Sequence, residues 1–342
     1  MGGFIEPHRA ELIAKVSETA ERRLGADKAA DFTAFIHHYF AHVPLQDVHG
    51  ETTDALFGAA YAHWKKGRKR TSSRPCVRVY NPRLDEHGWR SEHTVVEVVT
   101  DDMPFLVDSV TAMLNRRDLA VHLTIHPIVP VIRDSEVEAQ GIAADADAEA
   151  AEVNRESFMH FEVSQQPGSA LPEIAKAVED VLSDVRAAVE DWRQMADRMQ
   201  EVVNGLDAAT KWLPEEDVNE VRAFLQWVHD DHFTFLGYRE YAFSGGGSDA
   251  TISVVADVGL GVLRDPDFTV FHELRAIASM PPAVQAFVSR PDLLLVTKTN
   301  VPSTVHRPVP MGFHRHQEVR RRRPGHRSTD VRRAVHFGCL QP

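Results

Sequence analysis

The sequence of 342 residues contains only two cysteines, Cys76 and Cys339. Two thiols are too few for the disulfide framework of a small secreted domain or for a cysteine metal cluster. No apolar run approaches the ~20 residues that a membrane-spanning helix needs. The first residues also lack the apolar core of a secretory signal. The sequence therefore predicts a cytoplasmic protein that has no membrane partner.

Signatures of catalysis and of metal binding are missing too. The segment Gly259–Arg264 has the first two glycines of a dinucleotide-binding loop, but Arg264 replaces the third, so we interpret it as a turn or bulge. The segment His229–His232 could supply ligands to a divalent ion. We interpret it instead as a helix end, where a histidine can meet unpaired carbonyls. No catalytic, cofactor-binding or metal-ligating residue is assigned, and we expect the chain to bind no cofactor.

Acidic side chains outnumber basic ones over most of the chain. Residues 1–310 hold 30 of the 38 Lys and Arg residues and 48 of the 50 Asp and Glu residues. That part therefore carries a net charge of −18. Such an acidic body makes nucleic acid an unlikely partner, since nucleic-acid binders present a basic face. The segment Lys65–Arg74 holds six basic residues. We interpret it as a solvated linker and not as a nucleic-acid patch, because no aromatic residues interleave with its charges.

The clearest pattern that is present runs from residue 94 to 134 and predicts a strand, a turn, a helix and a second strand. Thr94–Thr100 is a β-branched run typical of a buried strand. Asp101 or Asp102 is predicted to cap the next helix, and Pro104 suits its first turn. The two carboxylates could instead form an acid/base pair, but capping and the helix dipole explain them adequately. Apolar residues recur at 3.6-residue spacing from Phe105 to Leu114.

Six segments follow one another in the order known from one protein family. They are VVEVVTDDMPFLVDSV at residues 95–110, Ile125–Pro127, Ser157–His160, Asp230–Arg239, Gly259–Arg264 and Ser303–Pro308. Over about residues 1–309 the chain resembles the N-terminal region of the large bacterial NAD-dependent glutamate dehydrogenases. The resemblance implies regulatory or architectural ACT-like and PAS-like modules, with NAD held by a catalytic domain further along the parent polypeptide. The parent reaction would be oxidative deamination of glutamate, and this chain alone is predicted to be inactive.

The resemblance to ACT modules raises a topological question. An ACT sheet has the ferredoxin-like order βαββαβ with its last strand beside its first, yet no strand follows the second predicted helix here. A strand at Cys76–Tyr80, joined by a hairpin to Thr94–Thr100, would occupy the position of the missing last strand and would run antiparallel to its neighbour, as that strand does. We therefore predict a permuted ACT-like sheet. Its returning strand is Ser157–Ser164, with Phe158, His160 and Glu162 on one face; His160 is interpreted as a packed or edge histidine.

The predicted fold class is α+β. Apolar spacing indicates three N-terminal helices, around Leu12–Ala20, Phe32–Phe40 and Leu56–Trp64, and an amphipathic helix opened by Pro172 that covers the sheet. Residues 135–156 are interpreted as an acidic loop. The predicted parts are a helical segment at 1–70, an ACT-like domain at 75–192, a helical spacer at 193–230, an incomplete PAS-like module at 231–309 and a disordered Arg-rich tail at 310–342.

In the predicted PAS-like module, strands alternate with short helices. The expected strands are 233–243, 251–256, 261–263, 293–299 and 303–309, with a short helix at 282–289, and a further helix at 217–229 precedes them at the end of the spacer. Beyond residue 310 the composition changes, with no lysine from Met311 onward and no apolar periodicity. Our hypothesis is an out-of-frame translation of GC-rich DNA, with a nucleic-acid-binding arm as the rival. If no other frame beyond Arg307 gives a long open continuation, the hypothesis fails.

The resemblance also indicates one place for a ligand. ACT modules often bind a small amino acid beside the loop between first strand and first helix, which here is Asp101, Asp102, Met103, Pro104 and Phe105. ACT loops typically carry a glycine after the proline, whereas this chain has Phe105. An amino-acid effector is therefore one prediction, and a structural or interface role, through self-association or other dehydrogenase subunits, is the other.

Overall fold

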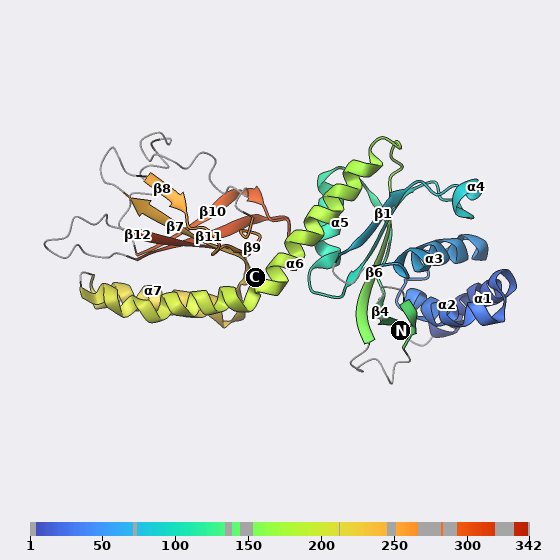
Figure 1. The fold of residues 1–342 in the computed structure, drawn as a ribbon, viewed down its shortest axis with the longest axis horizontal. Coiled ribbons are helices and arrows are strands. Elements are labelled where there is room, and N and C mark those ends of the chain that lie inside the picture. The colour runs from blue at the N-terminus through green and yellow to red at the C-terminus, as the bar shows by residue number, and fades with distance from the viewer. Residues whose placement is uncertain are drawn as a thin grey trace. The chain divides into compact units, whose positions relative to one another are not determined.

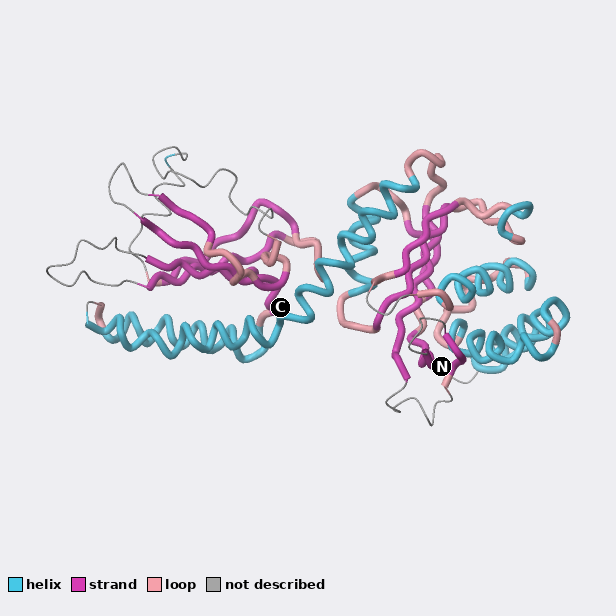
Figure 2. Tube along the Cα trace, in the orientation of Figure 1, coloured by secondary structure: helices cyan, strands magenta, loops and turns pink. Residues whose placement is uncertain are grey.

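The structure is a computed structural model that describes residues 5–70, 74–133, 139–143, 153–211, 213–244, 251–265, 282, 293–318 and 332–340. It confirms the α+β class, with N-terminal helices and an antiparallel sheet (Figures 1 and 2). The chain divides into two compact units, Met1–Leu182 and Ser183–Pro342. Among the described residues, no helix combines the length and apolar character that crossing a bilayer needs.

The first unit begins with three helices, as predicted: α1 (Ile5–Leu24), α2 (Ala26–Phe40) and α3 (Thr53–Gly67). Thr52 caps α3, because its hydroxyl accepts a hydrogen bond of 3.2 Å from the Ala55 N–H. The buried faces of the three helices share one core with side chains of the sheet, including Val99, Ile125 and Phe158. The helical segment therefore belongs to the same compact unit as the sheet.

Among the described residues, six strands form the first sheet. They are β1 (Cys76–Tyr80), β2 (Thr94–Asp101), β3 (Val121–Ile125), β4 (Ile128–Arg133), β5 (Ala139–Ile142) and β6 (Val153–Val163). Their order is β1-β2-β6-β4-β5, and β3 also pairs with β6. A short helix, α4 (Leu84–His87), lies between β1 and β2, and α5 (Leu106–Arg116) connects β2 to β3.

The strand order is that of the predicted permuted sheet. Strand β1 pairs antiparallel with β2 in the register Cys76↔Val99. Strands β2 and β3 both pair antiparallel with β6, so they run parallel to each other with β6 between them. This is a split βαβ unit closed by a preceding hairpin strand. Within 135–156, however, residues 139–142 form β5 and 153–156 begin β6, so the expected single loop is wrong there, because these short segments pair with β4.

The two faces of β6 separate as the period-2 pattern predicts. Phe158 packs in the core shared with α1–α3, whereas Met159 and Phe161 face the other side and are equally buried. Figure 1 shows α1–α3 on one side of this sheet, and α5 and the start of α6 (Leu171–Gly205) on the other. The predicted boundary at residue 192 falls inside α6, which is continuous through 205.

The second unit consists of helices and a second six-stranded sheet. After α6 come a 3₁₀ turn η2 (Leu206–Lys211), α7 (Glu215–Trp227) and a π-helical turn η3 (Val228–His232). The strands are β7 (Thr234–Ser244), β8 (Thr251–Val254), β9 (Leu260–Gly261), β10 (Leu294–Pro302), β11 (Pro310–Glu318) and β12 (Arg332–Leu340). Their order is β10-β11-β12-β7-β8, with β9 on β7. The predicted β7–β8 hairpin is confirmed.

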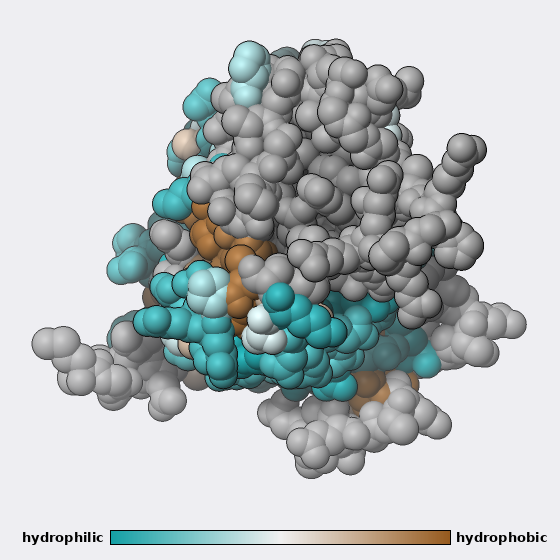
Figure 3. Space-filling view, turned by 90° about the vertical axis from the view of Figure 1, so that its left-hand side faces the viewer, coloured by the Kyte–Doolittle hydropathy of each residue, from teal (hydrophilic) through white to brown (hydrophobic). Residues whose placement is uncertain are grey.

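The core of the second unit joins apolar side chains of α6, α7 and β7, among them Met199, Leu225 and Tyr238. Figure 3 shows hydrophobic side chains gathered in a band beside a strongly hydrophilic surface. The predicted turn at Gly259–Arg264 is also confirmed. Gly261 has a φ of 59°, and a Cβ there would lie 2.1 Å from the Leu236 carbonyl oxygen, so only glycine fits.

Two predictions for the end of the chain are wrong. Residues 303–309 are bends and not a strand, because the Ser303 hydroxyl bonds to the N–H and carbonyl of Val305 and His306 has a φ of 63°. The tail is not disordered over Pro310–Glu318 and Arg332–Leu340. There it forms β11 and β12, because β12 finds hydrogen-bonding partners on both sides, β11 and β7. The out-of-frame origin stays a prediction, and of the predicted helix 282–289 all but Pro282 lies outside the described residues.

Candidate functional site

The candidate loop, Asp101–Phe105, leaves the sheet at the end of β2. Asp101 is the last residue of β2 and is paired with Glu156, and the Asp102 N–H donates to the Arg155 carbonyl at 2.9 Å. Helix α5 begins only at Leu106, with Phe105 at its N-cap and no side-chain cap hydrogen bond there. The predicted capping by Asp101 or Asp102 is therefore wrong. The backbones of both aspartates continue the β-ladder with β6, so both residues lie too far before the first helical residue, Leu106, to cap the helix.

Phe105 adopts an unusual backbone conformation. Its φ of 72° and ψ of 0° lie in the left-handed region, which costs a residue with a side chain about 1–2 kcal/mol. Its carbonyl already accepts the first helical hydrogen bond, from the Ser109 N–H at 3.0 Å. This is the position after the proline where the family resemblance implies a glycine. A phenylalanine thus occupies a turn whose geometry suits glycine.

A buried ionic network holds the base of this loop. It consists of Arg70, Asp101, Arg133 and Glu156, and we call it the Arg–Glu network. Arg70 reaches Asp101 at 2.6 Å and Glu156 at 2.9 Å, and Arg133 binds Glu156 through Nε at 2.5 Å and through a second nitrogen at 2.7 Å. Arg70 and Glu156 are 1% and 0% exposed. Two cations and two carboxylates give the network no net charge, as a buried site requires.

The network also corrects the interpretation of Lys65–Arg74 as a solvated linker. Helix α3 continues to Gly67, and Arg70 turns inward to the two carboxylates. Arg133 additionally donates to the Gly67 carbonyl at 2.8 Å and the Arg68 carbonyl at 3.2 Å, the acceptors that a helix end leaves unpaired. The end of α3, strands β4 and β6, and the loop are therefore joined by one set of charged hydrogen bonds.

A second buried polar group lies between α3 and the sheet. Glu97, in the middle of the valine-rich strand β2, is 1% exposed and accepts from Arg78 Nε at 3.0 Å and from the Tyr80 hydroxyl at 2.8 Å. Burial and the charge of Glu97 raise the pKa of Tyr80 well above its ordinary value, so it remains a donor. Glu97 is thereby compensated by one cation and one hydroxyl.

His160 lies beside this group on β6 and is fully buried. Its Nε2 is 3.5 Å from Glu162 Oε1 and its Nδ1 is 3.9 Å from Glu97 Oε1. Burial opposes ionisation of Glu162, but the proximity of His160 and a hydrogen bond from Ser91 leave the pKa of that carboxyl below its usual value. The interpretation of His160 as a packed histidine is confirmed. The edge alternative is wrong, since β6 is a central strand.

His63 of α3 completes this buried layer. Its Nε2 lies 3.2 Å from the Val98 carbonyl, which can only accept, and its Nδ1 lies 3.3 Å from the Tyr39 hydroxyl. A neutral ring that carries its hydrogen on Nε2 satisfies both contacts. Burial lowers the pKa of His63 to about 4, although Glu97 acts in the opposite direction. His63 is thus a neutral structural histidine.

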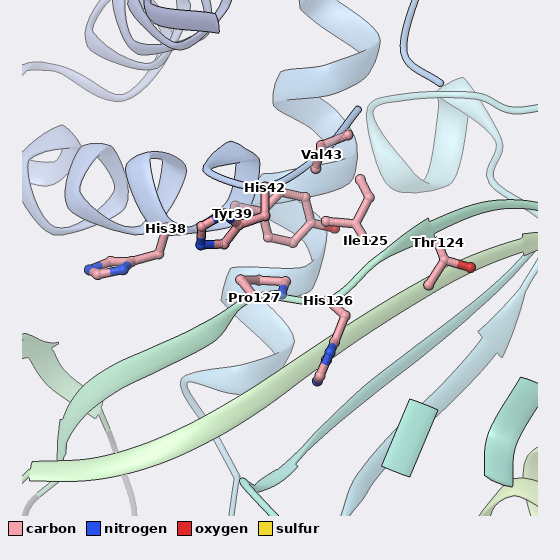
Figure 4. A pocket seen from close by; sticks show the side chains of 8 residues that line it. All are labelled: His38, Tyr39, His42, Val43, Thr124, Ile125, His126 and Pro127. Atoms are coloured by element: carbon pink, nitrogen blue, oxygen red, sulfur yellow. The ribbon is translucent and has the colours of Figure 1, made fainter. Parts of the chain in front are cut away.

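A small pocket of about 180 Å³ lies between the end of α2 and the junction of β3 and β4 (Figure 4). Three histidines line it, but in Figure 4 the His126 ring points away from His38 and His42. His126 Nε2 instead lies 2.6 Å from the Ser157 hydroxyl. Burial lowers the pKa of His126, while the charge of Asp102 in the candidate loop raises it. One histidine that lines the pocket therefore lies within the electrostatic influence of Asp102.

Among the residues that the structure describes, no group of three or more His, Cys, Asp or Glu side chains is placed so that it could hold a metal ion. At His229–His232 the helix ends in a π turn, Asp231 has a φ of 60°, and His232 Nδ1 lies 2.9 Å from the Trp227 carbonyl. The interpretation as a helix end is confirmed.

Sequence reasoning missed the residues that organise the first unit. Glu97 interrupts a valine run, and a charged residue inside a buried strand is itself a signal that a partner lies nearby. Arg70 and Glu156 carried no such signal, because each sits among polar neighbours. Their partners come from distant parts of the chain, which a local pattern cannot identify.

The strand order, the helices on both faces and the loop after the second strand define the first unit as an ACT-type module. Comparison with known families agrees, since the glutamate dehydrogenase ACT1 domain matches residues 35–178. The chain is 35% identical over 306 residues to the NAD-specific glutamate dehydrogenase of Halomonas elongata and 31% identical over 316 residues to that of Pseudomonas aeruginosa. It carries the N-terminal ACT1 region of the large NAD-specific glutamate dehydrogenases.

These matches involve most of this chain but little of its relatives. They cover 89% and 90% of the chain, and 19% of the length of each of the two relatives. A third, the NAD-specific glutamate dehydrogenase of Mycobacterium tuberculosis, is 27% identical over 62% of the chain and 12% of its own length.

Proposed function

We propose that this chain is a regulatory or architectural module of an NAD-dependent glutamate dehydrogenase whose reaction is the oxidative deamination of glutamate to 2-oxoglutarate and ammonia. The observation that carries the proposal is the ACT1 match at residues 35–178, joined to the ACT-type strand order. The chain itself does not carry out hydride transfer, which needs a bound nicotinamide and a positioned substrate.

Within this function the loop Asp101–Phe105 serves structure and not sensing. Its base is held by the Arg–Glu network, and Phe105 occupies the turn where a ligand would approach the backbone. An immobilised loop of this kind suits an interface with a second copy of the chain or with other parts of the dehydrogenase. The NAD cofactor belongs to the parent's catalytic domain, and the cytoplasm is the compartment that suits such an enzyme.

Amino-acid sensing by a stand-alone module is the second candidate. One feature favours it: His126 lines the pocket of about 180 Å³, and the charge of Asp102 in the candidate loop partly offsets the lowering of the His126 pKa by burial. A cavity of that size suits a small ligand. The second unit is proposed to be a PAS-like module, because the family resemblance implies one in this part of the chain and an antiparallel sheet lies there.

The test of the main proposal is an assay of NADH formation by the purified chain with glutamate and NAD. No glutamate-dependent NADH should form, while a complete glutamate dehydrogenase under the same conditions serves as the positive control. Turnover that follows the chain through purification would refute the proposal. Sedimentation velocity over a concentration series checks self-association, for which a concentration-independent monomer is the opposing result.

A further inference from the structure

A cavity of about 360 Å³ lies in the first unit between α3, β1 and α4. Figure 1 labels these three elements. Three lysines line the cavity, Lys65 and Lys66 in the last turn of α3 and Lys69 just beyond the helix, together with Arg78 of β1 and Glu86 of α4. We call this cavity the lysine pocket. It is separate from the candidate loop Asp101–Phe105, none of whose residues lines it.

The charge of the lysine pocket is unbalanced. Arg78 is compensated by Glu97, whereas Lys65, Lys66 and Lys69 form no ion pair that is recorded with a described residue. Glu86 is the one carboxylate among the lining residues that the structure describes, and it contacts His87 at 3.8 Å. Like charges around one cavity repel one another, and a bound anion relieves that repulsion. The excess contrasts with the net charge of −18 that residues 1–310 carry as a whole.

The walls of the lysine pocket are fixed while its lysines can adapt. Tyr61 at its inner wall stacks on Phe57 with ring centroids 5.5 Å apart, and His87 of α4 packs on Tyr80 at 4.8 Å. Lysine ammonium groups on flexible stems are compact point charges that can adapt to a phosphate group, whereas the fork of arginine binds carboxylate and phosphate in a fixed bidentate geometry. The concave form also suits a small molecule better than an extended strand of nucleic acid.

We propose that the lysine pocket binds a small anion that carries two or more phosphate groups, held by Lys65, Lys66 and Lys69. This site goes beyond the proposed architectural function, and neither depends on the other. Nothing in the candidate loop is required for it.

The proposal is tested with inorganic triphosphate, titrated into the full chain at low ionic strength by isothermal calorimetry. The double variant Lys66→Gln/Lys69→Gln should weaken binding by at least about tenfold, because each charged hydrogen bond contributes on the order of that factor. The matched control is Lys15→Gln/Lys176→Gln, which removes the same charge from exposed lysines paired with Glu11 and Asp180 in the same unit. This control should bind as the unchanged protein does.

Cys76 reports where the anion binds, because it also lines the lysine pocket. Triphosphate should slow its alkylation by N-ethylmaleimide, measured by mass spectrometry. Absence of saturable binding, equal weakening by the two double variants, or unprotected Cys76 would each overturn the proposal. So would citrate binding as tightly as triphosphate, which would indicate a carboxylate site, or a single-stranded oligonucleotide displacing triphosphate at lower concentration.

Discussion

Arg70 and Glu156 form an ion pair in which neither side chain reaches solvent: the two are 2.9 Å apart and no more than 1% exposed. The pair joins the end of α3 to β6, and through Asp101 it reaches the loop that follows β2. Buried ion pairs seldom add net stability compared with apolar residues, but removing one partner leaves the other charge buried without compensation. The pair is therefore a sensitive point of the first unit.

Changing Glu156→Gln should destabilise the first unit by about 3 kcal/mol, because Arg70 and Arg133 would keep their charges but lose the buried carboxylate that both of them contact. Urea unfolding measures the loss. The control is Glu173→Gln, which removes an exposed partner of Arg117 and should cost less than about 1 kcal/mol. Equal costs for the two variants would show that the Arg–Glu network does not hold this unit together.

Phe105 offers a test of the backbone conformation in the candidate loop. Both Phe105→Gly and Phe105→Ala remove the ring, but only glycine adopts a φ of 72° without strain. The glycine variant should therefore be more stable than the alanine variant by about 1 kcal/mol. Thermal unfolding of the two proteins, compared directly, measures the difference. An alanine variant as stable as the glycine variant would contradict the left-handed turn.

His63 should make the first unit sensitive to acid. Its pKa is about 4 when folded and near its ordinary value of 6.5 when unfolded, so the unfolded chain binds the proton more readily. Its contribution is fully present above pH 6.5 and is lost as the pH falls toward 4, with about 2 kcal/mol gone by pH 5. The variant His63→Gln keeps a donor and an acceptor but cannot titrate. It should flatten the profile of stability against pH between 7 and 5, and an unchanged slope would contradict the buried neutral histidine.

The pairing of β11 and β12 implies that the end of the chain stabilises the second sheet. Strand β12 pairs with both β11 and β7, so a chain ended at Val309 would leave β7 with an unpaired edge. Hydrogen exchange in β7 should accelerate and the shortened protein should aggregate, while the first unit keeps its protection. Unchanged exchange in β7 would show that these strands do not complete the sheet.

Much of the first unit follows from the sequence, because local patterns determine it. The valine run of β2, the alternation in β6 and the turn after Tyr80 predict the hairpin, the split βαβ and the two faces of the sheet. The apolar spacing around Leu56–Trp64 likewise predicts α3.

The candidate site was less predictable, for physical reasons. Pairs such as Arg70 with Glu156 depend on tertiary contacts between segments that no periodicity links. Asp101 and Asp102 have the chemistry of helix caps, but two further residues of β-ladder and the turn at Phe105 move the helix start to Leu106. In the tail, pairing of β12 on both sides produces strands that composition did not indicate.

The central claim is that the loop Asp101–Phe105 is architectural, and calorimetric titration of the full chain with a panel of amino acids tests it most directly. We predict no saturable binding, because Phe105 occupies the turn where a ligand would approach and the Arg–Glu network immobilises its base. Saturable binding of an amino acid that Asp102→Ala abolishes would contradict the account and identify the loop as a sensor.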